Sequence, residues 1–238
     1  MEDKKKNIII IILILIIIIL GILIAVVKNT KSYTADEKKF KEEYESLNGT
    51  KSKNSGKKIM EVTIPKDNNI KYITSKEVID ILKNKTGVIY FGFPECPWCR
   101  NAIPVLINAA NCECLDEVYY FNALSIRDIK HLDENGKIIT DKEGTKDYYE
   151  IVKILGDKLS SYEGLNDASI KRLYFPTVVF VRDGEIVDLH ISTVDDQKDP
   201  SKELTKKQKE DLLKIYKDGI KKIKTNPNTC DGPGKTTC

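Results

Sequence analysis

The most prominent hydrophobic pattern is an unbroken run near the N-terminus. From Ile8 to Val27, nineteen of twenty residues are apolar and none is charged. At ~1.5 Å per residue, a helix over this run is ~30 Å long, which is the thickness of the hydrocarbon core of a bilayer. Because no face of the run is polar, it is not a buried helix of a soluble domain. We predict a transmembrane anchor at residues 8–27, with a cleaved signal peptide as the alternative.

Lysines lie on both sides of this predicted anchor, so charge alone does not give its orientation. Only residues 1–7 precede it, whereas a long domain follows, and long domains are translocated largely regardless of their charge. Four of the six cysteines lie outside the Cys96–Cys99 pair, which favours an oxidising compartment. We therefore expect a single-pass protein of the cell membrane, with a cytosolic tail at residues 1–7 and an extracytoplasmic domain.

After the anchor, the pattern changes from polar to alternating. Residues 28–58 are polar and rich in lysine, which is typical of a tether. Within them, Phe40, Tyr44 and Leu47 follow helical spacing, so we expect a short helix whose apolar stripe docks on the domain. The tether is followed by a predicted domain at residues 59–225 and a cysteine-containing tail at residues 226–238.

Within residues 59–225, strand and helix patterns alternate. The run Gly87–Phe93 is apolar throughout, as expected of a strand covered on both faces. Asn135-Gly136 and Arg182-Asp183-Gly184 separate apolar runs and predict hairpin turns. This alternation predicts an α/β sandwich with a mixed sheet. The expected strands are 61–64, 70–73, 87–93, 118–122, 177–181 and 185–191, and the expected helices lie near 75–82, 97–110, 148–159 and 212–223.

Composition narrows the function classes. The 238 residues include 39 basic and 36 acidic ones, and the two kinds are interleaved. This balance argues against nucleic acid as a partner, because nucleic-acid-binding domains usually concentrate basic charge on one face. His131 and His190 are distant from each other and from the cysteine pair, so we interpret both as structural or surface residues.

The chemically informative motif is Cys96-Pro97-Trp98-Cys99, which follows the apolar strand and begins a predicted helix. A thiolate at a helix N-terminus faces free N–H groups and the positive end of the helix dipole, which lowers its pKa. Pro97 suits the first helical position, where its missing N–H costs nothing. We predict that Cys96 is the attacking thiol and that Cys99 resolves the mixed disulfide. Arg100 on the same helix is expected to add positive potential.

Other states of the cysteines stay open. Zinc at the motif would need two further ligands, and Cys112 and Cys114 lie ~15 Å along the helix from its start. An inert structural disulfide is a second alternative for the motif. We predict neither a metal nor a cofactor. The other four cysteines allow three pairings: we favour bonds from Cys230 and Cys238 to Cys112 and Cys114, and the alternatives are a Cys230–Cys238 loop and free or metal-bound thiols.

Two segments of the chain resemble the thioredoxin-like superfamily. Residues 88–106 are similar to its active-site strand and helix, and residues 173–185 resemble its second hallmark, a cis-proline and a threonine before a hairpin. The resemblance covers roughly residues 70–223 and implies a three-layer α/β sandwich with a mixed sheet and an insertion before the proline. It also implies that Pro176 is cis and lies beside the cysteine pair, and that the backbone of Phe175 pairs with substrate peptide.

The sequence departs from thioredoxins at the motif itself. Tyr90 stands six positions before Cys96, where thioredoxins commonly have a buried acid, and Pro-Trp separates the cysteines instead of Gly-Pro. These differences leave the direction of catalysis open. The anchor and the insertion are more similar to membrane-bound thioredoxin-like proteins and to bacteriocin transport accessory proteins of low-GC bacteria.

The sequence thus predicts a membrane-anchored thiol–disulfide oxidoreductase. Its expected partners are the thiols and disulfides of exported proteins and an unidentified redox partner. The alternative is a non-catalytic thioredoxin-like module that holds a partner during protein or peptide export.

Overall fold

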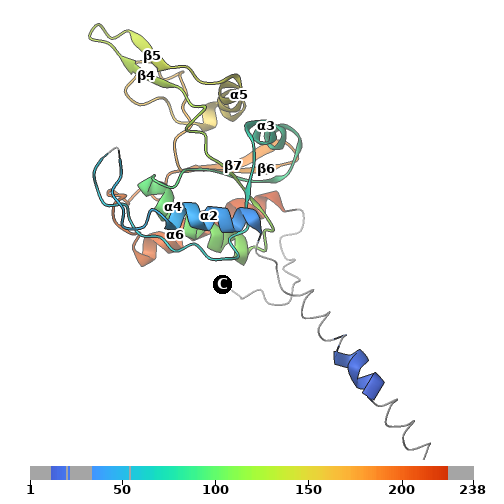
Figure 1. The fold of residues 1–238 in the computed structure, drawn as a ribbon. Coiled ribbons are helices and arrows are strands. Elements are labelled where there is room, and N and C mark those ends of the chain that lie inside the picture. The colour runs from blue at the N-terminus through green and yellow to red at the C-terminus, as the bar shows by residue number, and fades with distance from the viewer. Residues whose placement is uncertain (1–11, 20, 22–33, 54, 225–238) are drawn as a thin grey trace, which may run out of the picture. The chain divides into compact units, whose positions relative to one another are not determined.

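The computed structural model describes residues 12–19, 21, 34–53 and 55–224 (Figure 1). The chain divides into two units, residues 1–34 and residues 35–238. Residues 12–19 are helical, with exposed apolar side chains. No helix among the described residues is long and apolar enough to cross a membrane. The other residues of the predicted anchor lie outside the described part, so the anchor stays a prediction.

A five-stranded mixed sheet forms the centre of the second unit. β3 is parallel to β1 and β2, whereas β6 is antiparallel to both β2 and β7. The structure is therefore an α/β fold with a mixed sheet. In the order in which they neighbour one another, the strands are β1 (Ile70–Tyr72), β3 (Val118–Phe121), β2 (Gly87–Phe91), β6 (Thr177–Arg182) and β7 (Glu185–Ile191).

Helices cover both faces of this sheet (Figure 1). The first face carries α2 (Ala35–Glu45), α4 (Pro97–Cys112) and α6 (Lys206–Ile223), and the second carries α3 (Ser75–Asn84) and α5 (Lys146–Leu155). Neighbouring residues of β2 point to opposite faces, as in any strand. Val88 and Tyr90 join the core of the first face, and Ile89 and Phe91 join that of the second. The fully buried β2 therefore connects both halves of the core.

Threonine side chains cap the starts of α3, α5 and α6. Thr74 and Thr205 begin capping boxes in which their hydroxyls accept from the N–H groups of Glu77 and Gln208. The Thr145 hydroxyl caps α5 by accepting from the Tyr148 N–H. α4 differs, because its capping atom is a sulfur.

The segment predicted as a tether contributes to the domain core. Phe40 and Tyr44 of α2 are fully buried, and the Phe40 ring packs edge-on against Tyr120, with 4.9 Å between the ring centroids. The apolar stripe therefore docks on the domain, as its spacing predicts. The compact unit at residues 35–238 includes this segment.

Two local predictions differ from the structure. The strand expected at residues 61–64 is wrong: the backbone N–H and C=O of Val62 bond to the side chain of Asn48 instead of to a strand. α5 ends at Leu155, and Leu159 follows a short 3₁₀ turn, although it is buried in the same cluster. The hairpin predicted at Asn135-Gly136 is present and joins β4 (Ile129–Leu132) to β5 (Ile138–Lys142), which form a separate two-stranded sheet.

The burial of α2 is testable by truncating one side chain. We expect Phe40→Ala to lower the free energy of unfolding by roughly 3–5 kcal/mol, the usual cost of removing a buried aromatic ring. The Lys38 side chain on the same helix is 62% exposed. Lys38→Ala should therefore change the free energy of unfolding by less than about 0.5 kcal/mol. Urea-induced unfolding of the full chain in mild detergent measures both variants. Equal stability of the two would show that α2 is a tether without a part in the core.

Candidate active site at the start of helix α4

The end of β2 and the start of α4 position the two cysteines of the motif. Cys96 occupies the N-cap of α4, and its Sγ accepts a hydrogen bond from the Cys99 N–H at 3.2 Å. Pro97 takes the first helical position, where no N–H is needed. Cys96 Sγ therefore takes the place that threonine hydroxyl oxygens occupy at the starts of α3, α5 and α6.

The surroundings of the two thiols separate their pKa values. Burial raises the pKa of Cys96, but hydrogen bonds from the Cys99 thiol and from the N–H groups of Cys99 and Trp98, together with the charge of Arg127, outweigh it and hold this pKa below its ordinary value. Burial, the hydrogen bond to Cys96 and the Cys96 charge raise the pKa of Cys99 well above its ordinary value. The negative charge of the pair therefore develops on Cys96.

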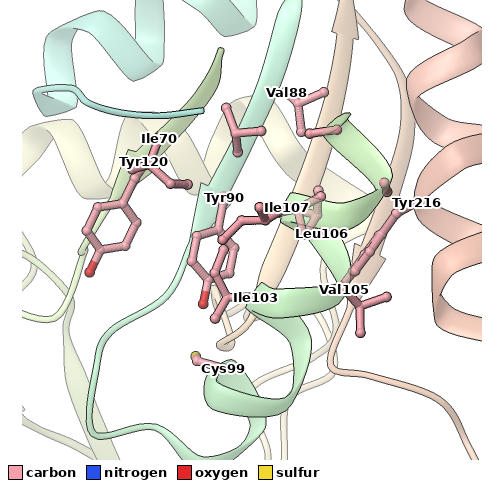
Figure 2. Packing of buried hydrophobic residues seen from close by; sticks show 14 of the residues in the cluster. Ile70, Val88, Tyr90, Cys99, Ile103, Val105, Leu106, Ile107, Tyr120 and Tyr216 are labelled. Atoms are coloured by element: carbon pink, nitrogen blue, oxygen red, sulfur yellow. The ribbon is translucent and has the colours of Figure 1, made fainter. Parts of the chain in front are cut away.

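The inner thiol lies at the end of the hydrophobic core. Cys99 is fully buried and Cys96 is 5% exposed, and the Tyr90 hydroxyl is directed toward Cys99 (Figure 2). That hydroxyl also shares a hydrogen bond of 3.0 Å with the hydroxyl of Tyr44 from α2. Burial raises the pKa of Tyr90 well above its ordinary value. The group that faces the buried thiol is therefore a neutral phenol.

A second segment, distant in the sequence, completes the site. The peptide bond between Phe175 and Pro176 is cis. The carbonyl oxygen of Phe175 lies 3.7 Å from Cys96 Sγ, although the two residues are 79 positions apart. The Phe175 ring packs edge-on against Phe93, with 5.5 Å between the centroids. Trp98 is half-buried, and like Phe93 and Phe175 it packs against the core cluster that contains Cys96 and Cys99.

Arg100 has a different role from the one predicted. Its guanidinium is buried and donates to the carbonyl oxygens of Tyr44, Met60 and Pro94 and to the side chain of Asn48. These bonds join the start of α4 to α2 and to the segment after it.

The charge of Arg127 also lowers the pKa of Cys96, after the hydrogen bonds to its sulfur. Arg127 lies between β3 and β4, outside both thioredoxin-like segments. Sequence reasoning missed it because a single arginine in a long insertion belongs to no motif.

The two histidines, interpreted from the sequence as structural or surface residues, make local contacts. His131 pairs with Asp141 at 2.6 Å on the β4–β5 hairpin, and His190 packs edge-on against Tyr216. Across residues 34–53 and 55–224, no group of three His, Cys, Asp or Glu side chains is arranged to hold a metal ion.

The remaining described cysteines lie at the far end of α4. Cys112 and Cys114 are disulfide-bonded, whereas Cys230 and Cys238 lie outside the described residues. Between Cys112 and Cys114, the buried Glu113 faces lysines at the C-terminal end of α6. Its carboxylate lies within 4 Å of Lys217, Lys221 and Lys224, and Lys224 also donates to its carbonyl oxygen.

Comparison with known proteins adds no relative. No protein-family model matches the chain, and no curated protein or solved structure is significantly similar to it. The thioredoxin-like resemblance therefore stays a prediction from residues 88–106 and 173–185. Any function for the site rests on its own geometry and chemistry.

The pairing of the tail cysteines is a prediction that peptide mapping checks. Lys224 contacts Glu113, and extended chain of at most roughly 20 Å separates Lys224 from Cys230. We therefore expect digestion without reduction to recover peptides that link Cys112 and Cys114 to the tail. The same digest after reduction, which should release the separate peptides, is the control. A Cys230–Cys238 peptide without residues 112–114 would contradict this pairing.

Proposed function

We propose that this protein is a membrane-anchored thiol–disulfide oxidoreductase with a thioredoxin-like fold, acting on exported proteins. One observation carries the proposal. Cys96 Sγ is bound by the first N–H groups of a helix, above a buried second thiol, and lies beside the carbonyl group that precedes a cis-proline. The first feature favours a nucleophilic thiolate, and the last offers substrate peptide a backbone group next to it.

The arrangement of elements supports the thioredoxin-like part of the proposal. A buried strand, β2, leads into the helix that carries the dithiol, and the hairpin β6–β7 follows Pro176 directly. The apolar run at residues 8–27 supports the membrane anchor, and the surplus of cysteines supports an extracytoplasmic domain.

The proposed reduction takes two steps. In the first, the Cys96 thiolate attacks one sulfur of a substrate disulfide, a Cys96–substrate disulfide forms, and the other substrate sulfur leaves as a thiolate. In the second, Cys99 loses its proton and attacks Cys96 Sγ. The Cys96–Cys99 disulfide forms and the second substrate thiolate leaves, so two electrons have passed to the substrate. A dithiol of the unidentified redox partner then reduces the enzyme, and oxidation of a substrate dithiol follows the same steps in reverse.

The environment of Cys99 suits the second step. In the resting dithiol, the Cys96 charge and the hydrogen bond to Cys96 help to keep Cys99 protonated. Once Cys96 is part of a mixed disulfide, that charge is gone, so both effects weaken. The hydrogen bond from the Tyr90 hydroxyl, which lowers the pKa of Cys99, remains. Formation of the mixed disulfide therefore makes the buried thiol easier to ionise.

The reduction potential of the dithiol determines which direction dominates. Groups that stabilise the Cys96 thiolate stabilise the reduced form and raise the potential. A value near about −270 mV would indicate a reductase, and one near about −120 mV an oxidase.

Trapping of mixed disulfides in living cells tests the proposed roles. We expect Cys99→Ala in the full chain to accumulate mixed disulfides with exported proteins, because the resolving thiol is lost and external thiols are far less concentrated at the bond. Cys96→Ala should accumulate none, since Cys99 is fully buried. Non-reducing electrophoresis detects the adducts, and sequencing identifies the trapped proteins.

The two variants serve as controls for each other, because each retains one cysteine of the motif. Equal trapping by both would contradict the assignment of attacking and resolving thiols. If neither variant traps a protein, the oxidoreductase proposal fails and the non-catalytic export module takes its place.

A further inference from the structure

The insertion before the cis-proline brings a charged side chain to the dithiol. Arg127 lies in the segment between β3 and β4, and the Cζ of its guanidinium is 4.8 Å from the centroid of the Phe175 ring. Phe175 is the residue whose carbonyl oxygen lies 3.7 Å from Cys96 Sγ. Arg127 therefore covers the residue on which the proposed function places the substrate backbone.

This guanidinium is held in place by a carbonyl group and an aromatic ring. One of its nitrogens donates to the carbonyl oxygen of Leu173 at 3.4 Å, and the Phe175 ring supports its face. None of the ion pairs among the described residues includes Arg127. The adjacent carboxylate, Asp128, is buried and forms its ion pair with Lys130 at 3.6 Å. An arginine has five N–H donors, so most of those on Arg127 remain for another group.

A second arginine lies close to the first. Arg172 packs over Tyr162 with 4.0 Å between its Cζ and the ring centroid. Its Nε is buried and has no hydrogen-bond partner, and Arg172 belongs to no ion pair among residues 34–53 and 55–224. Burial and then the Arg172 charge lower the pKa of Arg127. Both arginines thus lie on aromatic rings, and neither belongs to an ion pair among the described residues. The opposite charge of Asp128 acts on Arg127 but forms its ion pair with Lys130.

We propose that Arg127, with Arg172 beside it, forms a subsite for a carboxylate of the substrate polypeptide, an acidic side chain within about three residues of the reacting cysteine. The inference rests on the proposed function. Guanidinium groups bind carboxylates through paired N–H donors. A substrate lying along Phe175 advances about 3.3–3.6 Å per residue, so its side chains near the cysteine come within reach of Arg127. The insertion thereby selects exported proteins with acidic residues next to their disulfides.

Two matched peptides test this subsite with the full chain in detergent. Both carry the same fluorescent mixed disulfide, and they differ only by Glu or Gln two residues from the cysteine. We expect kcat/KM for the Glu peptide to be about tenfold higher at low salt, a typical effect of one charge-assisted contact, and the ratio to fall as salt screens it. Arg127→Gln should bring the ratio close to one, and Arg127→Lys should retain part of it.

The ratio separates recognition from other effects of the substitution. A change in Cys96 reactivity or in folding alters the rates for both peptides together and leaves their ratio unchanged. Arg182→Gln is the matched control, since Arg182 is exposed at the end of β6 and bonds to the Lys222 carbonyl oxygen. It should leave the ratio as in the wild type.

The outcomes distinguish the subsite from the function on which it rests. Equal rates on both peptides with the wild type, or a ratio that persists in Arg127→Gln, would overturn the subsite and leave the oxidoreductase proposal standing. A wild type that cleaves neither peptide would overturn the proposed function, and the subsite with it.

Discussion

The hydrogen bond from the Cys99 N–H to Cys96 Sγ is the interaction on which the site depends. It makes a sulfur the cap of α4, so the free N–H groups of the helix stabilise charge on that atom. The same turn of helix directs Cys99 into the core, where burial disfavours its thiolate. Two identical side chains three positions apart thus acquire different chemistry from one helix start. The proposed order of attack and resolution follows from that difference.

Segments outside residues 88–106 and 173–185 also contact this helix start. α2 supplies Tyr44, whose hydroxyl bonds to that of Tyr90 near Cys99. Arg100 secures the chain after α2 to the first turn of α4. The segment between β3 and β4 supplies Arg127, whose charge helps to lower the pKa of Cys96 and whose Cζ lies 4.8 Å from the centroid of the Phe175 ring. α2 and the chain after it therefore support the inner thiol and the start of the helix, and the segment between β3 and β4 supports Phe175.

The sequence predicts the parts of this structure that follow from local periodicity. The apolar run of β2, the turns of both hairpins and the stripe of α6 are recognisable because a strand or helix buries a face at regular spacing. Residues 61–64 also look like a strand, but the Asn48 side chain occupies their backbone groups, and only the tertiary structure decides that competition. The placement of Cys96 at the helix start was predictable for the same local reason. The roles of Arg100 and Arg127 were not, because each depends on carbonyl groups and rings contributed by distant segments.

The ionisation of Cys96 tests the central claim most directly. The rate of alkylation of each thiol, followed by mass spectrometry against pH in the reduced full chain, gives the pKa of Cys96 separately from the others. We expect its midpoint to lie below the ordinary value of about 8.5, with Cys99 unmodified over the same range. In Cys99→Ala the midpoint should rise, because the hydrogen bond from the Cys99 thiol is lost. A Cys96 midpoint at or above the ordinary value, or equal modification of both thiols, would contradict the account.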